Sequence, residues 1–191
     1  MTAKVVLIGD SIRLGYQETV RRELTGLAEV WAPEENGETS RNVLAHLPEW
    51  VLSQGPTMVH LNCGLHDVKR APDTNALLVP LEEYRANVRQ LLEQVRQGTP
   101  ATVIWATTTP VNEAWHQAQK SFARFNADIR AYNAAAVAIA QALGLPVDDL
   151  FTVVMDAGRD RYLSADGVHF TDEGYELLGK VVADVIKKAL P

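Results

Sequence analysis

Three residues that could together attack an acyl carbonyl lie at opposite ends of the sequence. Ser11 follows an apolar run and the pair Gly9-Asp10, at the point where a helical pattern begins. Asp166 and His169 lie three residues apart, just before the last helical pattern. A serine hydroxyl becomes a nucleophile when a histidine accepts its proton and a carboxylate orients that histidine. The sequence therefore contains the residue types for nucleophilic acyl chemistry, provided that the fold brings its two ends together.

The position of Ser11 adds a second element of that chemistry. A strand that turns into a helix at a small residue presents the next side chain at the carboxyl edge of a sheet. The N-terminus of the helix has unpaired N–H groups and a partial positive charge, which suit a developing oxyanion. Each motif taken alone has a structural explanation, because Asp and Ser often cap helices and polar residues are common in loops before them.

Composition and charge exclude several classes of protein. The 191 residues include 18 basic and 24 acidic side chains, and the net charge of −6 argues against nucleic acid as the main partner. Cys63 is the single cysteine, so no internal disulfide can form, and no Cys/His spacing resembles a zinc site. No apolar stretch is long enough to span a membrane. The N-terminal residues lack the features of a signal peptide, so we expect a cytoplasmic protein.

Short apolar runs alternate with amphipathic stretches along the whole chain. This alternation predicts one domain over residues 1–191 with an α/β fold, a parallel sheet covered by helices on both faces. The expected strands are residues 4–8, 28–32, 57–62, 101–106 and a short fifth at 147–150. The helical patterns have apolar residues at 16–27, 43–51, 81–95, 129–143 and 177–186, and Thr171 is the expected N-cap of the last helix. We therefore expect a flavodoxin-like three-layer α/β/α sandwich with five parallel strands.

In such sheets the functional site lies outside the carboxyl ends of the strands. That rule selects residues 9–12, 36–41, 63–70 and 107–119, and the loop 166–169 would have to join them. Trp115 and His116 make the segment 107–119 the expected pocket wall. Other residues favour structural roles: His60 in the core, His46 on a helix surface, and Trp105 and Trp115 in packing.

Four short motifs occur in order on this predicted edge, and together they resemble the SGNH hydrolases, also called the GDSL esterase/lipase family. The resemblance covers nearly the whole chain. The four matching blocks are Gly9-Asp10-Ser11-Ile12, Asn36-Gly37-Glu38-Thr39-Ser40, Gly64-Leu65-His66-Asp67 and Asp166-Gly167-Val168-His169. Two positions depart from the family pattern: Ile12 replaces the usual Leu, and His66 replaces the Asn of the third block.

The resemblance implies a role for each matching residue. Ser11 would be the nucleophile, His169 the general base and acid, and Asp166 the residue that orients and stabilises the His169 ring. The oxyanion hole would consist of the backbone N–H groups of Ser11 and Gly37 and the side chain at position 66. A neutral His66 ring could replace the amide donor of the family's Asn through one N–H. Asp10 and Asp67 would cap and position the loops.

The sequence and its resemblance thus predict a serine hydrolase that cleaves carboxylic esters through an acyl-enzyme on Ser11, with no metal or organic cofactor. The short chain leaves little room for a lid, which favours small or exposed acyl groups, and the expected partner is a small-molecule ester. Alternatives are an acyltransferase or acetyl-sugar esterase with the same site, and a non-catalytic carbohydrate- or ligand-binding module on the same fold. The module would be favoured if Ser11 and His169 lay too far apart for a hydrogen bond. A metal hydrolase with His60, His66 and Asp67 as ligands has an unfamiliar ligand spacing.

Overall fold

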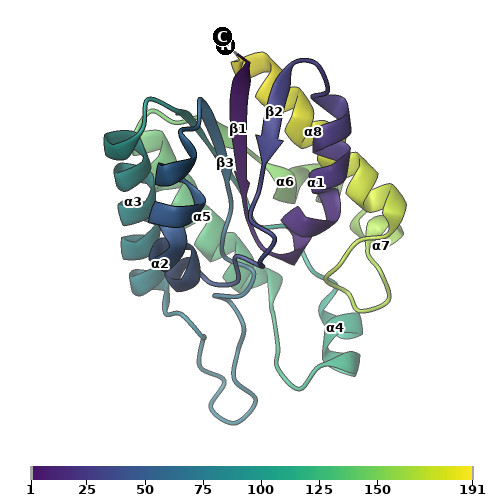
Figure 1. Ribbon diagram of the computed structural model, residues 1–191. Helices are drawn as coiled ribbons and strands as arrows, with labels where there is room; N and C mark the ends of the chain where they lie inside the picture. Colours follow the sequence, from purple (N-terminus) through teal and green to yellow (C-terminus); the bar gives the residue numbers. More distant parts are fainter. Residues whose placement is uncertain (1, 191) are drawn as a thin grey trace.

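The computed structural model describes residues 2–190 and confirms a five-stranded, all-parallel sheet flanked by helices (Figure 1). Neighbouring strands follow the order β2-β1-β3-β4-β5, so the chain crosses over from β2 to β3 on the far side of β1. The strands are β1 (Ala3–Ile8), β2 (Ala28–Trp31), β3 (Met58–Leu61), β4 (Thr102–Ala106) and β5 (Val147–Asp148). All five carboxyl ends therefore point to one edge of the sheet, the lower edge in Figure 1.

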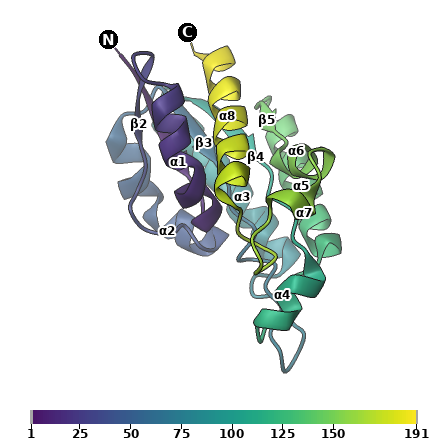
Figure 2. The ribbon, with the colours of Figure 1, turned by 90° about the vertical axis from the view of Figure 1, so that its right-hand side faces the viewer.

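The helices form a layer on each face of this sheet. Helices α2, α3 and α5 cover one face, and α1 and α8 pack together on the other (Figures 1 and 2). Their bounds are α1 (Ser11–Glu23), α2 (Ser40–Trp50), α3 (Leu81–Gly98), α4 (Glu113–Gln119), α5 (Asn126–Ala142), α6 (Leu150–Asp156), α7 (Arg159–Tyr162) and α8 (Asp172–Ala189), with a short 3₁₀ helix η1 (Leu52–Gln54). Within residues 2–190 we find no helix with both the length and the apolar character needed to cross a membrane.

The centre of the sheet is buried on both sides, as expected for parallel strands between two helical layers. Every residue of β3 is buried, and Trp105 of the neighbouring β4 is fully enclosed, which confirms its packing role. His60 lies in this core without solvent exposure, and its Nε2 is 2.9 Å from Oδ2 of Asp148 on β5. The predicted role of His60 as a hydrogen-bonded core residue is therefore confirmed.

Several predicted element boundaries are wrong. The first helix ends at Glu23, and Leu27, expected on its apolar face, lies in the following turn with 52% of its surface exposed. The fifth strand stops at Asp148 because Asp149 caps a new helix, α6, with its side chain accepting from the N–H of Thr152. The apolar run of α6 resembles a continuing strand, which explains the error.

The N-cap prediction for the last helix is confirmed, whereas the packing role of Trp115 is not. The side chain of Thr171 accepts from the N–H of Gly174 at the start of α8, and Asp172 and Glu173 lie in the first turn. Trp115 on α4 is 37% exposed, because its side of that short helix faces outward rather than into the core. His46 is partly buried rather than a free surface residue, because its ring stacks on Trp50 with centroids 4.5 Å apart.

Helices α1 and α8 approach one another so closely that their contact requires glycine. A Cβ atom built on Gly15 of α1 would lie 2.1 Å from the ring of Tyr175 on α8. A Cβ on Gly179 of α8 would lie 2.4 Å from Cβ of Thr19 and 3.0 Å from the backbone oxygen of Tyr16. Because Gly15 and Gly179 have no side chain, the two helices can lie this close together.

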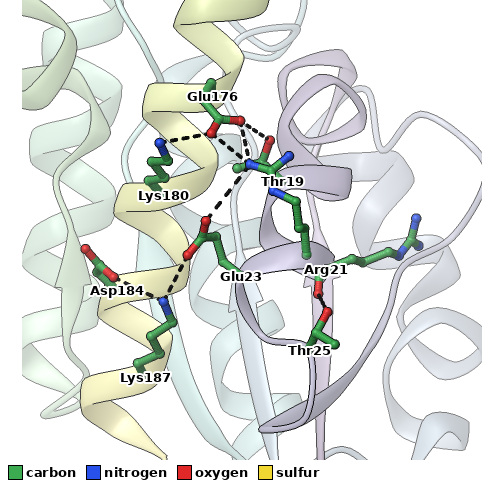
Figure 3. A network of polar contacts seen from close by, with 9 residues as sticks. Thr19, Arg21, Glu23, Thr25, Glu176, Lys180, Asp184 and Lys187 are labelled. Atoms are coloured by element: carbon green, nitrogen blue, oxygen red, sulfur yellow. Dashed lines mark hydrogen bonds and ion pairs between the residues drawn. The ribbon is translucent and has the colours of Figure 1, made fainter.

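Polar contacts border the same pair of helices (Figure 3). Glu176 of α8 accepts hydrogen bonds from Thr19 at 3.0 Å and from Arg22 at 2.7 Å, both on α1. Closer to the C-terminal end of both helices, Lys187 of α8 contacts Glu23 of α1 at 3.2 Å. Each exposed pair contributes little to the stability of the fold on its own. Together, the pairs place opposite charges side by side in the observed register of α1 and α8.

We expect Gly179→Ala to destabilise the protein although alanine favours a helix. The added methyl meets a β-branched side chain and a backbone oxygen, neither of which can rotate away. Overpacking of this kind costs about 1–3 kcal/mol, more than the helix propensity gain of about 1 kcal/mol. Urea unfolding followed by circular dichroism measures the net loss.

Gly98→Ala at the end of α3 is the matched control. Its Cβ would meet only the end of the Leu52 side chain at 2.9 Å, which can move. We expect this variant to be at least as stable as the parent. Equal stability changes in the two variants would contradict the proposed constraint on the α1–α8 spacing.

Candidate active site

Ser11 is held where β1 meets α1. The strand ends at Ile8, and Asp10 is the N-cap of the helix, with Oδ1 accepting from the N–H of Ile12 at 2.9 Å. Ser11 is the first helical residue, so its N–H has no acceptor within the helix, and none exists elsewhere in residues 2–190. The side chain and the free N–H of Ser11 therefore both lie at the carboxyl edge of the sheet, and Asp10 caps the helix as expected.

Asp166 organises the loop between α7 and α8. Its Oδ1 accepts from the backbone N–H groups of Val168 and His169 and from the hydroxyl of Ser164, each at 2.9 Å. Its Oδ2 lies 2.6 Å from Nδ1 of His169. Burial raises the pKa of Asp166, but the hydrogen bonds from the His169 ring, the two N–H groups and Ser164 outweigh it and leave the pKa well below its usual range. The carboxylate is therefore charged and fixed in position.

The loop brings His169 to Ser11 across 158 residues of sequence. Nε2 of His169 lies 2.9 Å from Oγ of Ser11. Because Nδ1 donates to the Asp166 carboxylate, Nε2 has the lone pair and accepts from the Ser11 hydroxyl. The side chain of His169 is 42% exposed, so solvent and small molecules can reach the pair. Ser11 and His169 are therefore within hydrogen-bond distance, whereas a larger separation would have favoured a non-catalytic binding module.

Gly37 lies against the turn that holds Ser11, but its N–H is already engaged. It donates to the backbone oxygen of Gly9 at 3.0 Å, and this bond ties the β2–α2 loop to the end of β1. To act in an oxyanion hole, as the sequence predicts, this N–H must share its hydrogen between Gly9 and a ligand. The predicted role of Gly37 stays a prediction.

His66 follows β3 on the loop that continues to Lys69. Its Nδ1 lies 3.0 Å from Nζ of Lys69. A protonated lysine is only a donor, so Nδ1 is the acceptor and the hydrogen of the neutral ring resides on Nε2. Burial lowers the pKa of His66 to about 3, and the charges of Lys69, Arg124 and His169 act in the same direction. His66 is thus a neutral imidazole with one N–H available, close enough to His169 to respond to its charge.

Asp67 connects this loop to the start of α2. Its carboxylate accepts from the N–H of Ser40 at 3.0 Å and from the Ser40 hydroxyl at 2.5 Å. Burial raises the pKa of Asp67 to about 6, and the two bonds from Ser40 offset part of that effect. The expectation that Asp67 positions loops is confirmed, since it joins the second and third blocks by direct bonds.

The segment 107–119 borders the Asp166–His169 loop, as the edge argument predicts. The N–H of Asn112 donates to the backbone oxygen of Gly167 at 2.8 Å, and Nε2 of Gln119 donates to that of Ala165 at 2.5 Å. His116 is fully buried, with both ring nitrogens unpartnered. Helix α4 therefore braces the loop that holds His169.

Sequence reasoning missed Arg124, which lies between α4 and α5. Only 5% of Arg124 is exposed, and its Nε donates to the backbone oxygen of Leu65 at 2.7 Å. Its charge acts on Asp10, Asp166 and His66. No local pattern marks Arg124, because it reaches the site from an irregular segment that none of the motifs includes.

The histidines and acids of the described residues form no cluster of three that could hold a metal ion. His60 is turned into the core toward Asp148, whereas His66 lies on the loop after β3 beside Lys69. The three residues of the metal-hydrolase alternative are therefore not gathered around one point.

Comparison with known proteins identifies the family to which this chain belongs. The model of the GDSL-like Lipase/Acylhydrolase family matches residues 7–177. The chain belongs to this family. A GDSL esterase/lipase of Arabidopsis thaliana is 26% identical over 99% of this chain and 87% of its own length. A bovine protein named isoamyl acetate-hydrolyzing esterase 1 homolog is 28% identical, covering 97% of this chain and 82% of the relative.

A solved structure extends the similarity to the whole fold. The lipase/acylhydrolase from Enterococcus faecalis superimposes with a TM-score of 0.84 at 27% identity, covering 100% of this chain and 98% of that one. This protein is accordingly a GDSL-family esterase or acylhydrolase, in the class of carboxylic ester hydrolases.

From the contact between His66 and Lys69 we predict the charge and the tautomer of the His66 ring, which NMR can measure. With a pKa near 3, the His66 ring should stay neutral, with its hydrogen on Nε2, from about pH 8 down to about pH 5. Nitrogen-15 NMR of the histidine side chains, assigned with His66→Asn, measures both charge and tautomer. A titration midpoint near 6, or a hydrogen on Nδ1, would contradict the assignment.

Proposed function

We propose that this protein hydrolyses carboxylic esters through a covalent acyl-enzyme on Ser11. The observation that carries the proposal is the continuous chain from Ser11 Oγ to His169 Nε2 at 2.9 Å and from His169 Nδ1 to Asp166 at 2.6 Å. A hydroxyl, an imidazole and a charged carboxylate in this order are the parts needed to activate an alcohol as nucleophile.

In the first half-reaction, Ser11 Oγ bonds to the ester carbonyl carbon while its proton moves to Nε2 of His169. The tetrahedral intermediate then breaks its bond to the alcohol oxygen, which takes the proton from His169 and leaves as the free alcohol. In the second half, water loses a proton to His169 and attacks the acyl carbon. The proton returns to Ser11 Oγ as the carboxylic acid departs. Asp166 keeps its charge throughout and stabilises the imidazolium.

Two donors are available for the negative oxygen of each intermediate. The Ser11 N–H lies at the N-terminus of α1 and has no acceptor in the described chain. The His66 ring supplies Nε2–H, with Lys69 holding its other nitrogen. Gly37 would be a third donor if its N–H were shared with Gly9. A neutral donor such as His66 adds a hydrogen bond without a competing proton transfer at neutral pH.

We propose small or exposed acyl groups as substrates. The 42% exposure of the His169 side chain supports an open site. The name of the bovine relative refers to isoamyl acetate, a short acyl group on a short branched alcohol, and an ester of that size suits such a site.

A fluorophosphonate probe tests the nucleophile. We expect one adduct per chain, on Ser11, because only an activated serine displaces fluoride from the probe at a useful rate. Ser11→Ala should remove both the adduct and the hydrolysis of 4-nitrophenyl acetate. Peptide mapping by mass spectrometry locates the adduct.

Ser164→Ala, which alters the nearby hydroxyl bonded to Asp166, is the matched serine control. It should still form the adduct on Ser11. An adduct on any other serine, or undiminished turnover by folded Ser11→Ala, would overturn the proposed mechanism.

The role of His66 is tested by two substitutions. His66→Ala should lower kcat by about 10²–10³, the usual cost of one oxyanion donor. His66→Asn should restore much of the loss, because an amide N–H can occupy the same place. Steady-state kinetics with 4-nitrophenyl acetate measures kcat for each variant.

A decrease of less than about threefold in His66→Ala, far below the cost of an oxyanion donor, would remove His66 from the hole. If Ala and Asn lowered kcat equally, simple donor replacement would be wrong.

A further inference from the structure

Arg124 is a buried cation whose terminal nitrogens have no partner. Its Nε is anchored to the backbone oxygen of Leu65, but Nη1 and Nη2 form no hydrogen bond within residues 2–190. The enclosed side-chain atoms that lack a partner include neither of these nitrogens, so both reach solvent through the 5% of the residue that is exposed. A guanidinium held this way presents a planar pair of donors to a ligand.

Lys69 adds a second positive charge beside it. The ring of Phe122 lies 5.1 Å from the Arg124 guanidinium carbon and 5.3 Å from Nζ of Lys69. Burial lowers the pKa of Arg124 to about 10, and burial together with the charge of Arg124 lowers the pKa of Lys69. At neutral pH Arg124 is therefore still protonated, and two cations share one aromatic ring.

The nearby acids act on this pair through their charge but form no ion pair with it within residues 2–190. Both oxygens of Asp166 are occupied by His169 and its own loop. Asp10 uses Oδ1 for the Ile12 N–H, and its Oδ2 is enclosed without a partner. Glu38 is exposed and acts on Lys69 only at a distance, since the two form no ion pair in the part of the chain that the structure describes.

The cationic pair lies immediately beside the candidate oxyanion donor. Lys69 contacts Nδ1 of His66 at 3.0 Å, and Arg124 is bound to Leu65, the residue before His66. Because the charge of Arg124 acts on Asp10 and Asp166, which flank Ser11 and orient His169, an anion held here would lie near an ester bound at Ser11. Its natural source is therefore a second group on the substrate itself.

We propose that Arg124 and Lys69 form a subsite for an anionic group of the substrate, so that the preferred esters carry a carboxylate or phosphate close to the scissile bond. This inference rests on the proposed function for its link to hydrolysis, and deepens it by naming the substrate class. Arg124 acts here as a specificity-determining residue that contacts substrate, and Lys69 serves both the anion and the His66 ring.

Two matched ester pairs distinguish an anion on the acyl side from one on the alcohol side. 4-Nitrophenyl hydrogen succinate and 4-nitrophenyl butyrate differ in a carboxylate on the acyl chain. 4-Acetoxybenzoate and its methyl ester differ in a carboxylate on the alcohol. For each pair the quantity measured is the ratio of kcat/KM for the anionic ester to that for the neutral one.

Arg124→Gln should lower this ratio for at least one pair by about 10- to 100-fold, the usual worth of hydrogen bonds between charged groups. The glutamine amide can still donate to Leu65, which keeps the loop anchored. Arg124→Lys, which retains the charge, should recover part of the ratio. Arg130→Gln is the matched control, because its guanidinium also lies over a ring, Phe151, at 4.4 Å, but outside the site.

A second measurement needs no turnover. Ser11→Ala protein, titrated with glutarate by calorimetry at low salt, should bind the dicarboxylate, and Ser11→Ala combined with Arg124→Gln should not. Lys69→Gln, on a partly exposed loop, is the substitute if Arg124→Gln does not fold, and it should weaken both the ratio and the binding.

The subsite would be overturned if Arg124→Gln left the kcat/KM ratios unchanged and glutarate did not bind. Arg124 would then serve only to compensate the negative charge of Asp10. An equal fall for anionic and neutral esters would also overturn it. If Ser11→Ala retained full hydrolysis while glutarate binding still required Arg124, the acyl-enzyme proposal would fail and the anionic subsite would stand.

Discussion

The close approach of α1 and α8 is the constraint on which the candidate site depends. Ser11 is the first residue of α1, and His169 lies three residues before the first residue of α8. The two side chains can meet only if the N-terminal ends of these helices are side by side. Glycines at the contact remove the side chains that would hold the helices apart, and the charged pairs along the seam match their register. A change of about 1 Å in this spacing would break the 2.9 Å contact between Ser11 and His169.

The substitution of His for the family's Asn at position 66 changes how a donor must be supported. An amide N–H is a donor at any ordinary pH, whereas an imidazole must be kept neutral and in one tautomer. Here burial and nearby positive charges keep His66 neutral, and Lys69 occupies Nδ1. The same cations that support the ring also create a local positive field in a protein of net charge −6. The His66 donor and the positive charges around it therefore depend on the same neighbouring residues at this edge of the sheet.

The sequence predicts the sheet well because parallel strands between two helical layers are nearly continuous apolar runs with turn residues at their carboxyl ends. Ser11 is predicted in the same way because it follows the first strand, whereas Asp166 and His169 lie between α7 and α8 and are identified by the resemblance of their block to the family motif. The apolar pattern places Leu150 in a strand, because periodicity cannot distinguish a short apolar helix from a strand. The structure is a helix because the side chain of Asp149 caps it with one hydrogen bond, which the apolar pattern does not indicate.

Arg124 has no signal in the sequence for a different reason, since a long side chain from an irregular segment belongs to no periodic pattern. The hydrogen bond from the Gly37 N–H to the Gly9 oxygen likewise cannot be predicted from the sequence, because it joins two separate loops.

The order of the elements along the chain has a consequence for synthesis. The nucleophile candidate emerges from the ribosome first and its histidine partner more than 150 residues later, with the whole sheet made in between. Helix α8 must leave the exit tunnel before it can dock on α1, so a nascent chain with all five strands already paired would still lack a paired Ser11. A chain interrupted before residue 169 therefore lacks the Ser11–His169 contact on which the proposed mechanism depends.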